Sequence, residues 1–247
     1  MTFSCDERSS PNFNARPDGC AVDILLLHYT GMASAEAALD RLCDADAKVS
    51  AHYFVDEGGR VTRMVPEDLR AWHAGVGRWA GESDINGRSI GIEIANGGHD
   101  FGSPPYPDVQ MAAVEALCLD ILSRHPIPPA RVLGHSDIAP GRKADPGEWF
   151  DWARLARAGI GLWVAPEPIV EGPSLAPGDR GDTVAEFQFM LASYGYGLEV
   201  LGHYDAATQD VVTAFQRHFR PAKVDGVADL STVATLRRLV EAAKAAA

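Results

Sequence analysis

The amino-acid sequence predicts an α/β fold, with a mixed central sheet flanked by helices and followed by a small three-helix domain. The runs 21–28 and 89–94 are almost continuously apolar, which is typical of strands buried on both faces of a sheet. Segments with helical spacing of apolar residues, such as 107–122, alternate with these runs, as they do in α/β proteins. A proline-rich stretch, 164–173, then precedes a purely helical region.

These observations divide the chain into three parts. Residues 1–163 form the α/β domain, which includes a polar N-terminal extension over 1–20. Residues 164–177 form a semi-rigid, proline-rich linker. Residues 178–247 form the helical domain, which is near the lower size limit for an independent hydrophobic core.

Composition and net charge limit the kinds of molecule that this chain is expected to bind. The chain has 247 residues, of which 46% are hydrophobic and 23% are charged, as in ordinary soluble globular proteins. Its formal net charge is −12, which argues against nucleic acid and anionic membranes as general partners. No apolar run approaches the ~18 residues of a membrane span.

The N-terminal composition and the cysteines bear on the compartment. Residues 1–18 are polar and lack the apolar segment of a secretory signal, so we expect a cytoplasmic location, or a periplasmic one if the N-terminus is incomplete. The four cysteines form no CxxC pair, which fits a reducing compartment. Cys43 and Cys118 lie in helical patterns and are expected to be small buried hydrophobes. A disulfide between Cys5 and Cys20 stays open at this point.

The first part of the α/β domain is predicted to be a strand, a helix and a hairpin. The strand 21–28 ends at His28, and Ser34 caps a helix over 35–45. The hairpin consists of a strand over 51–55, a tight turn over 56–59 and a second strand over 61–65.

The stretch 68–86 contains Trp72, His73 and Trp79 without clear periodicity. Exposed tryptophans in a loop commonly stack on a ligand, and the alternative is that these rings close over the core as a lid. In the strand that follows, Glu93 is a single carboxylate in an apolar setting. A buried glutamate is rare unless it is paired or functional.

Residues 107–122 form an amphipathic helix, which is followed by a short strand at Val132 and a loop over 134–147. We expect no helix in this loop because Pro140 and Pro146 lack backbone N–H groups and fix φ. Polar side chains at the end of a buried strand commonly carry function. The remaining expected helices cover 149–158, 183–194, 206–219 and 231–246.

Three candidate metal ligands lie at the ends of predicted elements: His28, His135 and Asp145. Two histidines and one carboxylate, with a fourth position left for water, form a standard arrangement of catalytic zinc. Separation along the chain is no obstacle, because the ends of neighbouring strands meet in space. With eight histidines in the chain, however, this pattern alone is a weak signal.

Five segments in a fixed order strengthen the zinc hypothesis. They are Leu27-His28-Tyr29-Thr30, Ser50-Ala51-His52-Tyr53, Ala71-Trp72-His73-Ala74-Gly75, Ser89-Ile90-Gly91-Ile92-Glu93 and the loop Gly134-His135-Ser136-Asp137-Ile138-Ala139-Pro140 with Arg142-Lys143 and Asp145-Pro146-Gly147. Over about residues 22–152 the chain thereby resembles the zinc-dependent N-acetylmuramoyl-L-alanine amidases of the AmpD/AmiD kind. That family shares its fold with peptidoglycan recognition proteins and with phage lysozyme amidases.

The resemblance implies that His28, His135 and Asp145 bind one Zn²⁺ and that Glu93 and Lys143 are catalytic. Glu93 would take a proton from the attacking water and pass it to the leaving amine. Lys143 would stabilise the oxyanion of the tetrahedral intermediate. The substrate-binding residues that the resemblance implies are His52, Trp72, His73, Ala74, Trp79 and Asn86.

The helical domain carries a second set of motifs. They are Gly178-Asp179-Arg180-Gly181-Asp182, Phe187-Gln188, Gly202-His203-Tyr204-Asp205, Phe215-Gln216 and Asp225-Gly226-Val227. These motifs resemble the three-helix peptidoglycan-binding domain that is often joined to cell-wall hydrolases. Such a domain would hold the enzyme on glycan or stem peptide, and the alternative is a merely stabilising helical cap.

Taken together, the sequence predicts a zinc amidase. It would hydrolyse the amide between the lactyl group of N-acetylmuramic acid, ordinary or 1,6-anhydro, and L-alanine, on peptidoglycan or muropeptides during cell-wall recycling. The alternatives are a non-catalytic peptidoglycan recognition module and a periplasmic wall-remodelling amidase. Relatives that only bind typically lose a zinc ligand, whereas all three are present here. The sequence predicts no oligomeric state.

Overall fold

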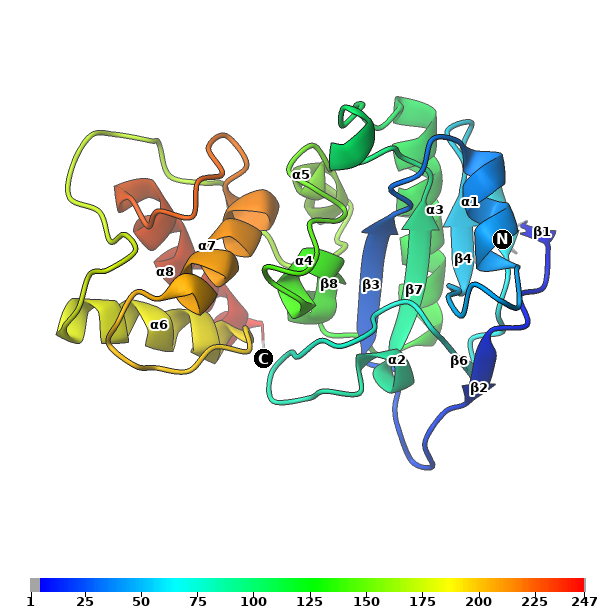
Figure 1. Cartoon of the computed structure of the whole chain (residues 1–247), viewed down its shortest axis with the longest axis horizontal. Helices are drawn as coiled ribbons and strands as arrows, with labels where there is room; N and C mark the ends of the chain where they lie inside the picture. Colours follow the sequence, from blue (N-terminus) through cyan, green and yellow to red (C-terminus); the bar gives the residue numbers. More distant parts are fainter. Residues whose placement is uncertain (1–4, 247) are drawn as a thin grey trace.

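A mixed six-stranded sheet forms the centre of the first domain (Figure 1). The computed structural model describes residues 5–246. Along the sheet the strands follow the order β1 (Asp6–Glu7), β5 (Val61–Arg63), β4 (Tyr53–Val55), β7 (Ser89–Ile94), β3 (Ile24–Tyr29) and β8 (Val132–Gly134). β4 and β5 are antiparallel, whereas the other neighbouring pairs are parallel. The predicted mixed sheet is therefore confirmed.

β3 is buried on both faces, as its apolar sequence predicts. It lies between β7 and β8. Leu25 and Leu27 pack in one apolar cluster with α3 (Asp108–Arg124) and α5 (Trp152–Arg157). Ile24 and Leu26 belong to the apolar cluster on the opposite face of the sheet. Because successive side chains point to opposite faces, His28 at the strand's end lies on the same face as Ile24 and Leu26.

Several short elements complete the first domain. α1 (Ala35–Leu42) is capped by Ser34, whose Oγ accepts a hydrogen bond from the N–H of Ala37, and it packs near β4. The other short elements are β2 (Phe13–Ala15) paired with β6 (Leu69–Ala71), α2 (Ile85–Arg88), and the 3-10 helices η1 (His99–Phe101) and η2 (Pro129–Arg131).

The polar N-terminal extension is part of the fold, which its composition did not indicate. It supplies β1 and β2, while residues 1–4 of the predicted extension lie outside the described range. Arg16 fixes it to the sheet by donating hydrogen bonds to the carbonyl oxygens of Gly87 (2.7 Å) and Ser89 (2.8 Å). Within residues 5–246 all four cysteines are free thiols, so Cys5 and Cys20 form no disulfide.

One helix lies where the sequence argued against any. α4 (His135–Ile138) begins directly after β8, inside the expected loop. Asp137 stabilises its first turn, because Oδ2 accepts a hydrogen bond from the N–H of Gly134 at 2.7 Å. Pro140 and Pro146 both come after the helix, so neither removes a hydrogen bond from it. The prolines limit the length of this helix without preventing it.

The second domain consists of α6 (Asp182–Tyr194), α7 (Ala206–Phe219) and α8 (Leu230–Ala245). Each helix matches its predicted range to within one residue at either end. Gln188 and Gln216 play the same part in two loops, since each Oε1 accepts hydrogen bonds from two successive backbone N–H groups. Asp205 and Asp229 then cap α7 and α8. Among the described residues, no helix is both long enough and apolar enough to cross a membrane.

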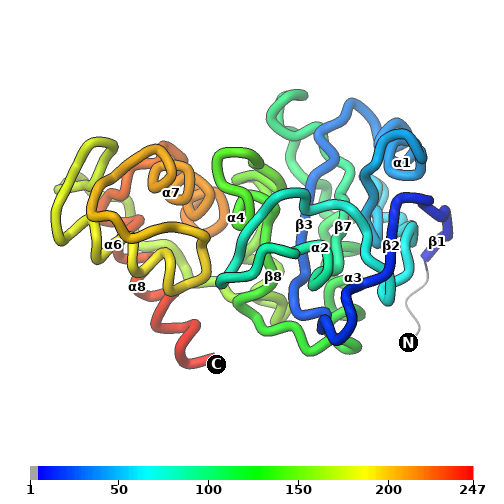
Figure 2. Tube along the Cα trace, turned by 60° about the horizontal axis from the view of Figure 1, so that its bottom comes forward, coloured from blue at the N-terminus to red at the C-terminus, as the bar shows by residue number. Residues whose placement is uncertain are grey.

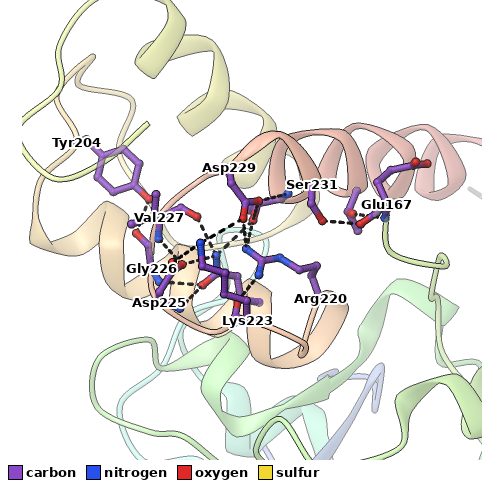
Figure 3. Close-up of polar contacts among 12 residues, drawn as sticks. Glu167, Tyr204, Arg220, Lys223, Asp225, Gly226, Val227, Asp229 and Ser231 are labelled. Atoms are coloured by element: carbon purple, nitrogen blue, oxygen red, sulfur yellow. Dashed lines mark hydrogen bonds and ion pairs between the residues drawn. The ribbon is translucent and has the colours of Figure 1, made fainter. Parts of the chain in front are cut away.

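A buried arginine holds the loop between α7 and α8 (Figure 3). The Arg220 side chain is fully buried, and its Nη1 donates to the carbonyl oxygen of Lys223. Its Nη2 donates to Asp229 Oδ2 at 3.2 Å and to Thr232 Oγ1 at 2.5 Å. These partners satisfy most of the donors of a charge that would otherwise be costly to bury.

The beginning of the proline-rich segment 164–177, which joins the domains, contacts α8. Ser231 Oγ donates to the carbonyl oxygen of Glu167 at 2.6 Å, and the N–H of Glu167 donates to Thr235 Oγ1 at 3.0 Å. Arg238 pairs with the Glu167 carboxylate at 2.6 Å. The segment is thus held by specific contacts at Glu167.

One apolar cluster is shared by the two domains, and α7 lies beside α4 in both views (Figures 1 and 2). Trp79, which is 1% exposed, contacts Tyr194 and Tyr196 edge-on, with ring centroids 5.6 and 5.0 Å apart. The N–H of Ala80 donates to the carbonyl oxygen of Gly195 at 2.7 Å. Gly195 has to be glycine, because a Cβ there would lie 2.6 Å from the Trp79 ring. Trp79 therefore joins the domains.

We predict that Trp79→Ala lowers the free energy of unfolding by about 3–5 kcal/mol, because it empties a large buried site between the domains. Denaturant unfolding followed by circular dichroism measures this loss. Trp149→Ala is the matched control, since Trp149 is 49% exposed and its removal should cost less than about 1 kcal/mol. Equal losses in the two variants would contradict the role of Trp79 in joining the domains.

Candidate metal centre and active site

Strand pairing brings the three candidate ligands to one edge of the sheet. His28 lies near the carboxyl end of β3 and is paired in register with Glu93 of β7. Gly134, the last residue of β8, pairs with Leu27, so the next residue, His135, begins beside His28. Asp145 returns to the same place because its carbonyl oxygen accepts a hydrogen bond from the N–H of Ser136 at 3.0 Å. The carboxyl edge of parallel strands is where α/β proteins commonly place their sites.

The donor atoms of these residues converge on one point. His28 Nδ1 lies 2.9 Å from His135 Nδ1, and each of these nitrogens lies 3.0 Å from Asp145 Oδ2. All three side chains are buried, and they form a cluster that could hold a metal ion. Two imidazole nitrogens and one carboxylate oxygen are a donor set that suits zinc, with a fourth position open. The geometry therefore fits the predicted ligand set.

A second layer of contacts orients the two imidazoles. With Nδ1 directed at the metal position, His28 Nε2 donates to His73 Nδ1 at 3.0 Å, and His135 Nε2 donates to the carbonyl oxygen of Ala74 at 2.9 Å. Asn86 fixes that segment, because its Oδ1 accepts hydrogen bonds from the N–H groups of His73 (3.0 Å) and Ala74 (2.8 Å). Partners of this kind hold the tautomer and the ring orientation of metal-binding histidines.

The electrostatics of the cluster favour the protonation states that a metal requires. Burial, followed by the charge of His135, lowers the pKa of His28 to about 4, so its ring is neutral near neutral pH. Burial alone would raise the pKa of Asp145, but the charges and hydrogen bonds of His135 and His28 outweigh it and place that pKa below the ordinary value of 3.8. A neutral imidazole and an ionised carboxylate are the ligating forms.

Glu93 lies next to this cluster without a partner. Its Oε2 is buried and has no hydrogen-bond partner among the described residues. Burial and the nearby charge of Asp145 raise the pKa of Glu93 well above 4.5, while Lys143 opposes the shift. An orphaned buried carboxylate oxygen beside convergent metal donors fits a site where a water molecule has to be bound and deprotonated.

The cluster opens into a cleft of about 490 Å³ between α1 and the segment 142–145. Lys143 is exposed and lines this cleft together with Glu93, so both predicted catalytic side chains reach the same space. Trp72 and His73, two of the residues predicted to bind substrate, also line it. The arrangement can bind a polar ligand whose reacting bond lies over the metal position.

Four other predicted substrate-binding residues lie elsewhere. Trp79 packs between the domains. Asn86 accepts a hydrogen bond from the backbone N–H of His73, and the Ala74 carbonyl accepts one from the His135 imidazole. His52 is fully buried, and its Nδ1 accepts a hydrogen bond from the N–H of Gly91 at 2.9 Å. Burial and the charge of Arg16 lower the pKa of His52 to about 3. None of the four lines the cleft.

Several residues that line the cleft were not predicted from the sequence, among them Tyr29, His99 and Arg142. Tyr29 Oη lies 3.0 Å from His99 Nδ1, and His99 Nε2 lies 3.1 Å from the carboxylate of Glu148. Arg142 donates to the carbonyl oxygen of Ala74 at 2.8 Å. Tyr29 and Arg142 belong to the five sequence segments that resemble the amidase family, and this could have marked them as residues of the site. His99 had no partner nearby in the sequence.

A second, larger cleft of about 950 Å³ lies beside α3. Its main carboxylate, Glu67, accepts hydrogen bonds from Tyr53 (2.7 Å) and Arg124 (2.7 Å) and pairs with His125 at 2.7 Å. Glu67 is therefore fully hydrogen-bonded, unlike Glu93, whose Oε2 has no hydrogen-bond partner among the described residues.

The fold and the site together are those of an α/β protein with a buried donor cluster that could hold a metal ion, at the edge of a cleft. A family model described as N-acetylmuramoyl-L-alanine amidase matches residues 18–148, and a peptidoglycan binding domain model matches residues 180–236. The chain belongs to the N-acetylmuramoyl-L-alanine amidase family, as its motifs indicated.

Relatives of known structure support this placement. The N-acetylmuramoyl-L-alanine amidase AmiD of Escherichia coli (strain K12) is 36% identical over 236 residues, which cover 89% of this chain and 83% of AmiD. The solved complex of E. coli AmiD with the substrate anhydro-N-acetylmuramic acid-L-Ala-D-gamma-Glu-L-Lys superposes with a TM-score of 0.76 over 92% of both chains at 35% identity. AMPDH3 of Pseudomonas aeruginosa, solved with anhydromuramic pentapeptide, gives a TM-score of 0.75 at 33% identity, over 97% of this chain and 96% of its own.

Glu93→Gln should make the metal-free chain more stable at neutral pH. Because the pKa of Glu93 is raised, the stability that its protonated carboxyl contributes is complete below pH 4.5 and is lost as the pH rises through the folded-state value. A neutral amide avoids that loss, at about 1.4 kcal/mol for each unit of raised pKa.

Thermal melts in the presence of a chelator, taken from mildly acidic to mildly alkaline pH, measure this difference. The gain in Tm for Glu93→Gln should grow with pH. Asp100→Asn removes an exposed carboxylate at the same cleft and should show no such trend. A Glu93→Gln variant that melts at or below the native temperature at alkaline pH would show that burial of this carboxylate is not destabilising.

Proposed function

We propose that this chain is a zinc-dependent amidase that hydrolyses the amide between the lactyl group of N-acetylmuramic acid and the L-alanine of the stem peptide. The observation that carries the proposal is the convergence of His28 Nδ1, His135 Nδ1 and Asp145 Oδ2 within 3.0 Å of one another, beside the unpartnered Oε2 of Glu93. A module that only binds peptidoglycan would need neither the complete donor set nor a buried carboxylate that is costly to keep.

His28, His135 and Asp145 would hold the zinc ion. Zinc supplies Lewis acidity, which activates water and polarises an amide carbonyl. His73 and the Ala74 carbonyl keep both rings directed at the metal position through the Nε2 hydrogen bonds.

Glu93 and Lys143 would act on the reacting groups. The raised pKa of Glu93 makes its carboxylate a competent base, so it accepts a proton from the attacking water and then delivers it to the departing alanine nitrogen. Lys143 brings an exposed ammonium group to the same cleft, where its charge stabilises the negative oxygen that develops on the carbonyl carbon.

The substrate class that we propose is the 1,6-anhydromuropeptide, consumed in cell-wall recycling. Two of the solved relatives contain anhydromuramyl peptides, and each of them covers more than nine-tenths of this chain. Trp72 and His73 line the cleft and would contact the sugar and the first residues of the stem peptide. The second domain would hold the enzyme on glycan or stem peptide and raise the local substrate concentration.

Lys143→Ala should retain zinc and lower kcat by about 10²–10³-fold, because it removes one stabiliser of the oxyanion. Asp145→Ala should lose both zinc and activity, because it removes a ligand. Atomic absorption of the purified variants, combined with turnover of a soluble muropeptide, separates the two roles. Lys244→Ala, an exposed lysine on α8, controls for loss of surface charge. Equal zinc loss in the Lys143 and Asp145 variants would refute the assigned roles.

Incubation of the zinc-loaded chain with anhydromuropeptide should release free stem peptide, and intact sacculi tested in parallel show whether polymeric wall is also cut. Mass spectrometry of the products measures both reactions. The proposed function fails if no stem peptide is released from either substrate, and absence of stoichiometric zinc would favour a recognition module. Fractionation of cells tests the recycling role, which activity outside the inner membrane would contradict.

A further inference from the structure

Helix α7 of the second domain contacts the catalytic loop, residues 134–148, at three places. The position of Gly141 is so close to α7 that a Cβ there would lie 2.2 Å from Asp210 Oδ2. Farther along the helix, Arg217 Nε lies 3.5 Å from Glu148 Oε2, and His218 Nδ1 lies 2.7 Å from Asp137 Oδ2. The contact at Asp137 lies two residues after His135, and those at Gly141 and Glu148 lie on either side of Asp145.

Asp137 connects the second domain to the segment that carries His135. It is fully buried and lies two residues after His135, inside the same helical turn. Its Oδ2 accepts hydrogen bonds from the N–H of Gly134 (2.7 Å) and from His218 Nδ1 (2.7 Å). Its Oδ1 accepts one from the Tyr196 hydroxyl at 2.9 Å. Both side-chain donors belong to the second domain, so that domain supplies most of what compensates the buried carboxylate.

His218 is itself held in place by stacking. Its ring lies 3.7 Å from the Trp152 ring at an interplanar angle of 19°, and 3.8 Å from the Phe219 ring at 5°. Trp152 comes from α5 of the first domain, so the imidazole is enclosed between the two domains. Because the ring is fixed on both faces, Nδ1 has one direction in which to donate, toward Asp137.

We propose that Tyr196 and His218 are positioning residues of the amidase reaction: through Asp137 they hold the first turn of α4, and with it the metal ligand His135. The inference rests on the proposed zinc-dependent function. Loss of the Tyr196 hydroxyl leaves Oδ1 of the buried Asp137 carboxylate unpaired, and loss of the His218 donor leaves Oδ2 with the Gly134 N–H alone. In either case α4 has to shift so that the carboxylate finds another donor or water. Small displacements of a metal ligand lower metal affinity and rate even when the ligand itself is intact.

On this inference the second domain acts on catalysis as well as on attachment to the wall. If the second domain loses its contact with Asp137, the enzyme should be slower on a soluble muropeptide. Attachment to the polymer gives no advantage with that substrate. A domain that serves only as a tether predicts no such effect.

Two tyrosines give a matched test. Tyr196→Phe removes the hydroxyl that donates to Asp137, whereas Tyr204→Phe removes an equally buried hydroxyl that donates to the Gly226 carbonyl oxygen (2.8 Å) inside the second domain. In the full-length chain, Tyr196→Phe should weaken zinc binding by about tenfold and lower kcat on soluble anhydromuropeptide, with KM within about twofold. Tyr204→Phe should lower Tm but leave zinc affinity and kcat within about twofold of native.

A pair of His218 variants keeps the test valid if a tyrosine variant folds poorly. His218→Asn keeps a donor near the position of Nδ1 and loses the stacking, whereas His218→Phe keeps a flat ring between Trp152 and Phe219 and loses the donor. Zinc affinity, measured by competition with a chromogenic chelator, should be retained in the asparagine variant and weakened in the phenylalanine variant. The reverse ranking would overturn the inference.

The native chain separates this inference from the function on which it rests. If the native chain binds no zinc or releases no stem peptide, the proposed function fails. If the native chain does both, and Tyr196→Phe and Tyr204→Phe have equal zinc affinity and equal kcat, then the function stands and the positioning role of Tyr196 and His218 is wrong.

Discussion

The parallel pairing of β3 with β7 and β8 is the constraint on which the rest of the site depends. It sets His28 opposite Glu93 and brings the end of β8 beside Leu27, so that His135 emerges next to His28. A slip of one residue in β3 would turn His28 toward the face covered by α3 and separate it from the other donors.

The same register places charged and polar groups where little solvent reaches them. Burial raises the pKa of Glu93 and lowers that of His28, whereas the charges and hydrogen bonds of His135 and His28 hold the pKa of Asp145 below its ordinary value. Close packing supports this arrangement from behind: a Cβ on Gly91 would lie 2.5 Å from the His73 ring, so glycine is needed for His73 to reach His28. The proposed zinc ion would offset the repulsion between Glu93 and Asp145, which couples metal binding to stability.

The second domain is packed against the part of the first domain that carries the site. It shares one apolar cluster with the sheet and provides both side-chain donors to Asp137. A tether needs only a flexible link, but Trp79, Glu167 and His218 are all fixed in contacts that connect the second domain to its surroundings. The arrangement supports the proposed role of the second domain in shaping the loop 134–148.

The sequence by itself determined the fold class, the buried strands and the three C-terminal helices, because local periodicity predicts each of these. It also determined the residue types of the candidate metal site, because they stand in contiguous motifs. Only the tertiary structure decided that α4 forms before Pro140, that the N-terminal extension adds β1 and β2, and that His52 and Asn86 lie behind the cleft. Trp79 shows the reason most clearly. Its surroundings come from residues more than a hundred positions away, and no local pattern records which distant surface will cover a tryptophan.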